Sequence, residues 1–110
     1  MARMLVIYKT PKDPAAFDKH YYGVHIPMAH QLPGLRKYEV SQGPVVPLAG
    51  ASDTYLIGTL HFDSMAAIQA AFASDCGRAC AADRLIFAPN DADVQMFLFD
   101  DHDTMERAAA

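Results

Sequence analysis

An apolar stripe at helical spacing follows Pro14 and runs up against a second proline at position 27. Its members stand at the i, i+4, i+7 and i+11 positions of a helix that packs on a core: Phe17, Tyr21, Val24 and Met28. His25 lies in the same row, where a small protein normally has an aliphatic residue. The segment predicts an amphipathic helix with one protonatable side chain on its packed face.

This helix is expected to begin at Pro14, behind the N-cap residue Asp13, and to run to about Ile26. Pro27 has no N–H, and its ring clashes with the carbonyl group four residues earlier. We therefore expect the helix to end or kink at Pro27 and to continue as a short turn to Leu32.

The remaining elements follow from hydrophobic periodicity and from turn residues. Strands are predicted at residues 3–9, 35–42, 53–62 and 94–99, and further helical segments from Met65 and at residues 77–87. The order β-α-β-β-α-β is the ferredoxin-like arrangement, an α+β fold in which a four-stranded antiparallel sheet carries both helices on one face. Residues 43–52 form a longer loop than a hairpin needs, which is typical of a lid or a partner-contacting arm.

The length of 110 residues suits one domain, which we place at residues 1–100, followed by an acidic and alanine-rich tail at 101–110. Hydrophobic residues make up 52% of the chain, more than one small domain readily buries. The face of the sheet away from the helices, with Tyr55 and Ile57, is therefore expected to pack against the same face of a second copy in a two-fold homodimer.

Charge and composition exclude several classes of protein. A net charge of -4 and the lack of a Lys/Arg run disfavour nucleic acid and anionic membranes as partners. No apolar stretch approaches the roughly 20 residues of a membrane span or resembles a signal peptide, so a cytoplasmic protein is expected. Cys76 and Cys80 are predicted to be buried or half-buried thiols, not a disulfide, redox pair or metal site. Motifs for nucleophilic hydrolysis, ATP or NAD binding are missing.

The pattern of residues resembles the EthD family, named for ethyl tert-butyl ether degradation. The resemblance rests on Met4–Lys9, Phe17, Tyr21–Tyr22, Val24–Pro27, Leu32–Leu35, Tyr38, Ala82–Asp83 and Phe87–Ala88, and it covers about residues 3–99. It implies a dimeric α+β barrel made of two ferredoxin-like subunits, with no metal or organic cofactor. Related barrels include muconolactone isomerases, polyketide cyclases and cofactor-independent monooxygenases, so the fold alone does not decide the chemistry.

His25 is the candidate catalytic residue, because it matches the histidine in the first-helix motif of the family. A neutral imidazole can take a proton from an acidic C–H or O–H group and return it elsewhere. The alternative is a packed histidine that donates one hydrogen bond to a backbone carbonyl. The side chains expected to contact a small hydrophobic or aromatic ligand are Tyr8, Tyr21, Tyr22, Met28, Tyr38 and His61. His20 and His30 are expected on wetter faces of the helix.

Three functions stay open at this point. The first is a cofactor-free enzyme of small-molecule catabolism, with His25 as the acid/base in an isomerisation or cyclisation, or with direct oxygenation of an ionised substrate. The second is a non-catalytic ligand-binding or accessory protein that supports a degradative monooxygenase. The third is a purely structural dimer in which His25 is a core residue. A ligand site requires a pocket of roughly a few hundred Å³ beside His25.

Overall fold

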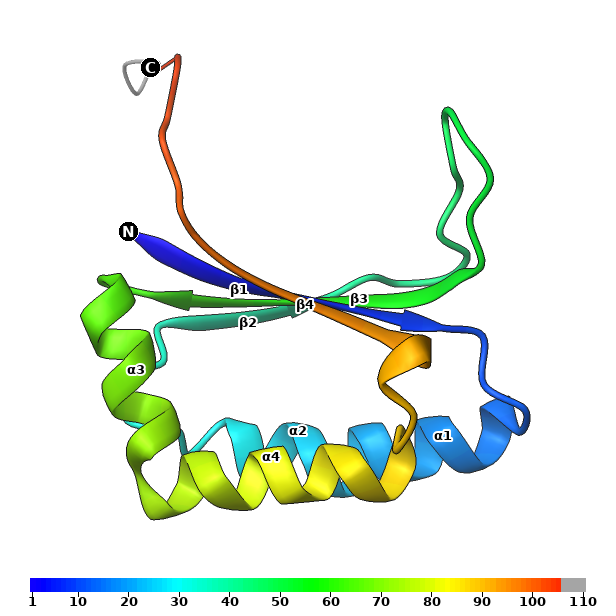
Figure 1. The fold of residues 1–110 in the computed structure, drawn as a ribbon, viewed down its shortest axis with the longest axis horizontal. Coiled ribbons are helices and arrows are strands. Elements are labelled where there is room, and N and C mark those ends of the chain that lie inside the picture. Colours follow the sequence, from blue (N-terminus) through cyan, green and yellow to red (C-terminus); the bar gives the residue numbers. More distant parts are fainter. Residues whose placement is uncertain (106–110) are drawn as a thin grey trace.

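One antiparallel sheet with helices on a single side organises the computed structural model, which describes residues 1–105 (Figure 1). The strands are β1 (Ala2–Lys9), β2 (Lys37–Val40), β3 (Thr54–Phe62) and β4 (Val94–Asp100). The helices are α1 (Pro14–His20), α2 (Ile26–Ala29), α3 (Met65–Ala73) and α4 (Asp75–Phe87), with a π-helical turn η1 (Tyr21–His25) and a 3-10 turn η2 (Asp91–Asp93). Residues 106–110 of the predicted tail lie outside the described residues.

The strand order is β2-β3-β1-β4, and every neighbouring pair is antiparallel. The α+β ferredoxin-like fold predicted from the sequence is thus confirmed. In Figure 1 the helices lie below the sheet, while the connection between β2 and β3 and the segment after β4 extend away from its other side. The sheet therefore has one covered face and one open face.

Side chains cap three of the helices where the sequence places capping residues. The Asp13 carboxylate accepts the Ala16 N–H at the start of α1, with Pro14 in the first helical position as predicted. The Ser64 hydroxyl accepts the Ala67 N–H at the start of α3. Ser74 caps α4 in the same way, so this helix begins at Asp75, two residues earlier than expected. These caps satisfy backbone donors that a free helix end leaves unpaired.

The first helix does not break at Pro27 but widens before it. The Ile26 N–H donates to the Tyr21 carbonyl five residues back, which is the bond of a π-helical turn. The extra residue in this turn rotates the following side chains by about one position, or about 100°. His25 and Ala29 therefore face the core. Val24 was expected in the packed stripe, but it is 44% exposed and lies outside it. Pro27 needs no N–H partner in this arrangement, so the helix continues through it.

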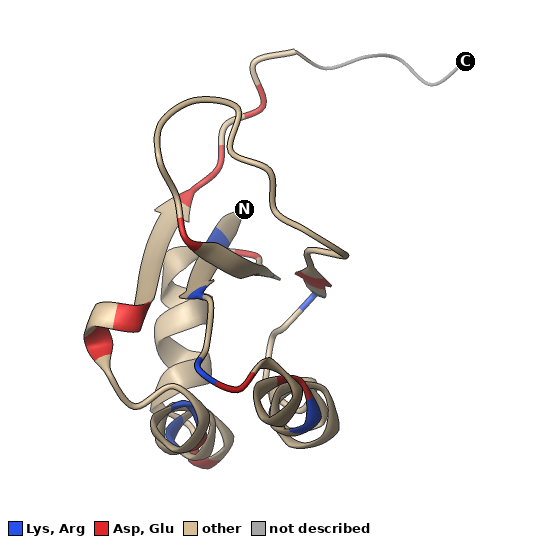
Figure 2. Cartoon of the chain, turned by 90° about the vertical axis from the view of Figure 1, so that its right-hand side faces the viewer, with Lys and Arg blue, Asp and Glu red and all other residues tan. Residues whose placement is uncertain are grey.

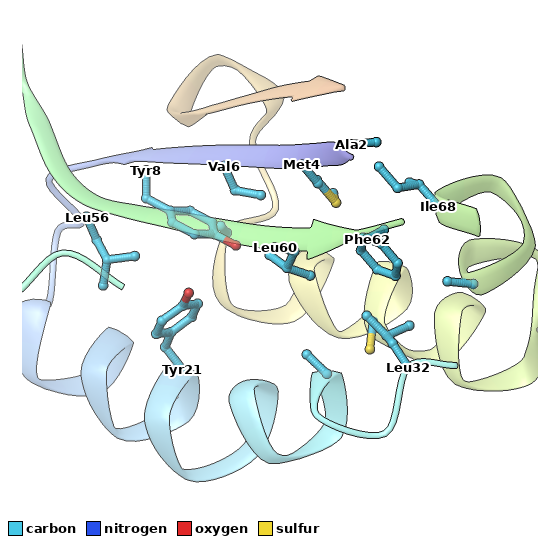
Figure 3. Close-up of a cluster of buried hydrophobic side chains, with 14 of the residues drawn as sticks. Ala2, Met4, Val6, Tyr8, Tyr21, Leu32, Leu56, Leu60, Phe62 and Ile68 are labelled. Carbon is cyan, nitrogen blue, oxygen red and sulfur yellow. The ribbon is translucent and has the colours of Figure 1, made fainter. Parts of the chain in front are cut away.

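The core lies between the helices and the covered face of the sheet (Figure 3). Alternate residues of β1 and β3 point into it, together with side chains from the helical layer: Ala2, Met4, Val6, Tyr8, Leu56, Leu60, Phe62, Phe17, Tyr21 and Ile68. Figure 3 shows Tyr21 rising from the helical layer toward Tyr8 on β1. Each Val, Leu, Ile, Phe or Met side chain in this set contributes about 1.5–3 kcal/mol when it is fully removed from water.

The open face leaves large apolar side chains in contact with solvent. Leu5 on β1 pairs with Phe97 on β4, and these positions point away from the helices. Phe97 is 46% exposed and Phe99 is 39% exposed. Within a single chain, β1 is thus covered on only one of its two faces. Tyr55 does not join this open face, because its hydroxyl donates to Asp18 of α1.

The described residues show how the charges and the two thiols are distributed. Figure 2 shows Lys, Arg, Asp and Glu in several elements, whereas α3 contains none of them. No described helix has the length and apolar character that a membrane crossing requires. Cys80 is buried and Cys76 is half-buried, and both are free thiols as predicted. Burial and then the neighbouring Cys76 raise the pKa of the Cys80 thiol to about 12, so this thiol stays protonated.

Candidate functional site

A buried carboxylate on α4 joins two histidines of the first helical segment. Asp83 Oδ2 lies 2.8 Å from His25 Nδ1, and Asp83 Oδ1 lies 2.8 Å from His20 Nε2. Asp83 and His25 are both buried, while His20 is half-buried. A carboxylate without its proton only accepts hydrogen bonds, so both ring nitrogens donate to it. We call this set of three residues the Asp83 cluster.

Burial and hydrogen bonding act against each other in this cluster. Burial disfavours an ionised Asp83, but the hydrogen bonds from His20 and His25 outweigh it and hold the pKa of this carboxyl below its ordinary value. Burial lowers the pKa of His25 and outweighs the opposing hydrogen bond and charge of Asp83. The stable form at neutral pH is therefore a neutral His25 imidazole beside an ionised Asp83.

The hydrogen bond to Asp83 fixes the tautomer of His25. With its proton on Nδ1, the Nε2 atom carries the free electron pair. Nε2 has no hydrogen-bond partner within residues 1–105. Every fully buried side-chain nitrogen or oxygen in these residues has a partner, so Nε2 is not fully buried. Nε2 thus belongs to the small accessible part of the side chain, and the imidazole ring stacks on Tyr21 and meets Phe87 edge-on. Such an imidazole, oriented by a carboxylate, is a competent general base.

Three of the predicted ligand-contacting tyrosines meet in the core beside His25. The hydroxyl groups of Tyr21 and Tyr38 lie 2.7 Å apart, and the Tyr8 ring packs edge-on against Tyr21. A Cβ atom at Gly58 would approach the Tyr21 hydroxyl to 3.1 Å, so glycine on β3 leaves space for this pair. Burial is the main cause that raises the pKa of Tyr8, Tyr21 and Tyr38. These phenols are donors at neutral pH and not bases.

The other predicted contacts do not converge on His25. His61 lies on the open face of the sheet, where its Nε2 is 2.6 Å from Glu39 Oε1. The alternation of β3 causes this, since Leu60 and Phe62 take the positions that point to the helices. Tyr22 is exposed and touches the edge of the Tyr21 ring. Met28 is half-buried, and its backbone carbonyl accepts a weak hydrogen bond from Cys76.

A partly open groove of about 710 Å³ lies between the β1–α1 connection and the end of α4. Phe17, His20 and Phe87 line it, together with residues of both connections. His25 does not line this groove, which opens at the His20 end of the Asp83 cluster. The expectation that His20 sits on a solvated face is also corrected, because its ring is hydrogen-bonded to a buried carboxylate.

Sequence reasoning missed Asp83, although a signal was present. Cys80, Asp83 and Phe87 follow helical spacing on α4, so an acidic residue stands on the packed stripe of this helix. A buried carboxylate requires a partner, and a histidine on the packed stripe of another helix is a suitable one. His20 gave no such signal, because five residues separate it from His25 and a regular helix would turn the two about 140° apart. The π-helical turn brings both to one carboxylate.

Comparison with known proteins agrees with this fold and with the segment that carries the cluster. The family model for the EthD domain matches residues 9–91, which includes His20, His25 and Asp83. The chain belongs to the EthD family. An uncharacterized 11.0 kDa protein in the thcB-thcC intergenic region of Rhodococcus erythropolis is 36% identical over 106 residues, which cover 96% of this chain and 98% of that protein.

Solved structures extend the comparison to the fold. An EthD family protein from Bacillus halodurans has a TM-score of 0.82 at 29% identity, with 93% of this chain and 99% of that chain covered. A dimeric ferredoxin-like protein of unknown function from Thermobifida fusca has a TM-score of 0.63 at 17% identity (89% and 88% covered). SnoaB, a cofactor-independent oxygenase from Streptomyces nogalater, has a TM-score of 0.63 at 14% identity (96% and 97% covered). These last two show a shared fold alone.

Proposed function

We propose that this EthD-family protein converts a small apolar compound by proton transfer, without a cofactor, and that His25 is the base. The observation that carries the proposal is the 2.8 Å contact between His25 Nδ1 and the buried Asp83 carboxylate. This contact leaves a neutral Nε2 as the acceptor, next to aromatic rings that suit a flat apolar compound. The reaction class is an isomerisation or a cyclisation.

The proton-transfer step uses groups that the chain itself provides. His25 Nε2 takes a proton from an acidic C–H or O–H group, and the electron pair of that bond stays on the substrate. Asp83 then stabilises the imidazolium, as a carboxylate does in other carboxylate–histidine pairs. Return of the proton to another atom of the substrate completes an isomerisation with no net loss of atoms or electrons.

Exchange of a carbon-bound hydrogen of the ligand with D2O tests this role before a product is known. A thermal-shift screen of small phenols, lactones and cyclic ethers first identifies a ligand, and NMR then follows deuterium incorporation. We expect the wild-type protein to catalyse exchange and His25→Ala to slow it by about 100-fold or more, the usual contribution of a general base. His30→Ala is the matched control, since His30 is exposed in the described chain and lies outside the Asp83 cluster.

Two results would reject this role for His25. An unchanged exchange rate in His25→Ala would place the base elsewhere. Ligand binding without any exchange would favour the second function, a non-catalytic ligand-binding or accessory protein that supports a degradative monooxygenase.

We further propose that the protein acts as a homodimer in which the open sheet faces pack together. The exposed Phe97 and Phe99 lie on this face beside Leu5, and a monomer rarely leaves such aromatic side chains in water. The Thermobifida fusca protein with the same fold is dimeric, which supports a second copy as the occupant. Sheet-on-sheet packing of this kind buries both faces of β1.

Sedimentation velocity measures this assembly directly. We expect a dimer for the wild-type chain at micromolar concentration and a monomer for Phe97→Glu, because a carboxylate in an apolar interface loses its hydration. Leu85→Glu on α4 is the control, since Leu85 is exposed on the helical side and should leave the dimer intact. A wild-type chain that sediments as a monomer would reject the assembly.

A further inference from the structure

The groove beside His20 has an apolar wall that extends from the core to an exposed side chain. Phe17 and Phe87 form its inner part, and Ile86 stands at its edge with 70% of its surface exposed. Most of the Ile86 surface is therefore not used for packing within the chain. The same side chain would become buried if a flat apolar compound lay against the two phenylalanine rings.

The charges around the groove balance one another. Lys9 and Lys12 line it on one side and have no ion pair within the described residues, and Asp13 and Asp93 line it as well. Asp13 already accepts the backbone N–H of Ala16. Two cations and two carboxylates give no net preference for a charged ligand. The group that distinguishes this groove from a plain apolar surface is therefore the His20 imidazole.

The orientation of His20 is fixed by the buried carboxylate. Its Nε2 donates to Asp83 Oδ1, which leaves Nδ1 as the ring nitrogen available to a ligand in the groove. The ring also packs against Phe87, with centroids 5.5 Å apart. Thus Asp83 orients one histidine toward the core and a second one toward the groove.

We propose that the groove binds a flat apolar compound with one weakly acidic hydroxyl group, a phenol or an enol, and that His20 Nδ1 accepts its hydrogen bond and its proton. In the transfer, the O–H bond breaks, its electron pair stays on oxygen, and a new N–H bond forms at Nδ1. The Asp83 carboxylate offsets the resulting imidazolium charge, so no other reactant is needed. The binding step is independent of the proposed function, in which His25 is the base. The proton transfer to His20 ionises the bound ligand and is not the transfer assigned to His25.

Binding of 1-naphthol tests the groove, and 1-methoxynaphthalene serves as the matched probe without the hydroxyl group. The chain has no tryptophan, so the fluorescence of naphthalene can be excited without a protein background. We expect saturable binding of 1-naphthol to the full chain. His20→Asn should weaken it about tenfold, as loss of one hydrogen bond to the ligand does, and should leave 1-methoxynaphthalene unchanged. The unfolding midpoint of each variant verifies that it is folded.

A substitution of Ile86 tests the apolar wall separately, and the same substitution of the neighbouring Leu85 is the control. Ile86→Ser should weaken both probes about fivefold, because it removes apolar surface from the wall. Leu85→Ser is the control, since Leu85 is 52% exposed on the same helix but does not line the groove. Ile86 is exposed, so its replacement tests the wall even if His20→Asn fails to fold.

Three results would overturn the proposal: no saturable binding of 1-naphthol, an Ile86→Ser variant that binds like the wild type, or an equal loss of both probes in His20→Asn. Absence of hydrogen exchange with any compound would instead reject the proposed function, and the binding results would stand.

Discussion

Replacement of Asp83 by alanine is expected to lower the free energy of unfolding by about 3 kcal/mol and to abolish proton transfer. The carboxylate is buried and accepts hydrogen bonds from His20 and His25, so its removal leaves two ring N–H groups without a partner. Removal of one member of a buried pair is among the most destabilising changes known. Chemical denaturation of the variant and the wild type measures the difference.

Asp75→Ala is the control for this measurement. Asp75 lies on the same helix, is exposed, and pairs with Arg78 only at the surface. Surface ion pairs of this kind contribute about 0–1 kcal/mol. Equal losses in the two variants would mean that the Asp83 cluster adds nothing to stability beyond an exposed pair.

The contribution of Asp83 to the free energy of unfolding depends on pH with a defined sign. The hydrogen bonds of Asp83 hold its pKa below the ordinary 3.8 in the folded chain, against the effect of burial. Its contribution to stability is therefore fully present above pH 3.8 and is lost as the pH falls through the lower, folded value. The stability difference between wild type and Asp83→Ala should thus narrow in acid. A difference that widens below this pH would contradict an ionised Asp83 in the folded state.

Gly77→Ala is expected to lower the free energy of unfolding by about 3 kcal/mol or more. A Cβ atom at this position would collide with the Ala71 carbonyl oxygen and the Phe72 Cα atom, which are backbone atoms at the end of α3. A rigid backbone cannot move aside as a flexible side chain can, so the two helices must separate. The higher helix propensity of alanine, about 1 kcal/mol, offsets only part of this loss.

Gly23→Ala is the matched comparison, because Gly23 is also helical but has open space where a Cβ atom would stand. We expect this variant to keep or slightly raise the unfolding midpoint, since alanine loses less backbone entropy than glycine on folding. A Gly77→Ala variant as stable as Gly23→Ala would show that α3 and α4 do not need the close approach seen at Gly77. Thermal unfolding monitored by circular dichroism distinguishes the two results.

Local sequence signals account for most of the fold. Asp13, Ser64 and Ser74 cap helices because a short polar side chain before an apolar helical stripe satisfies free backbone N–H groups wherever the rest of the chain lies. Alternation along β1 and β3 likewise determines which side chains face the helices. The order of elements then leaves few topologies besides the ferredoxin-like one.

The shape of the first helix before Pro27 depends on tertiary packing, which hydrophobic periodicity does not describe. The stripe at 3.6-residue spacing placed both Val24 and His25 on the packed face. With the π-helical turn before Pro27, His25 is buried as expected and Val24 is exposed. A proline imposes some irregularity on its helix, but whether the helix breaks, kinks or widens is decided by what the next turn packs against.

The sequence by itself determined the elements, their order and the presence of a histidine on a packed helix face, because these follow from interactions between residues close together in the chain. Only the tertiary structure decided that His25 shares a carboxylate with His20, 63 residues away from Asp83, and that the groove opens at His20. Hydrophobic periodicity along the chain predicts that a polar side chain is buried. Which residue becomes the partner of that side chain depends on how α1 and α4 lie on the same face of the sheet. Hydrogen bonds form only between side chains that packing brings within about 3 Å.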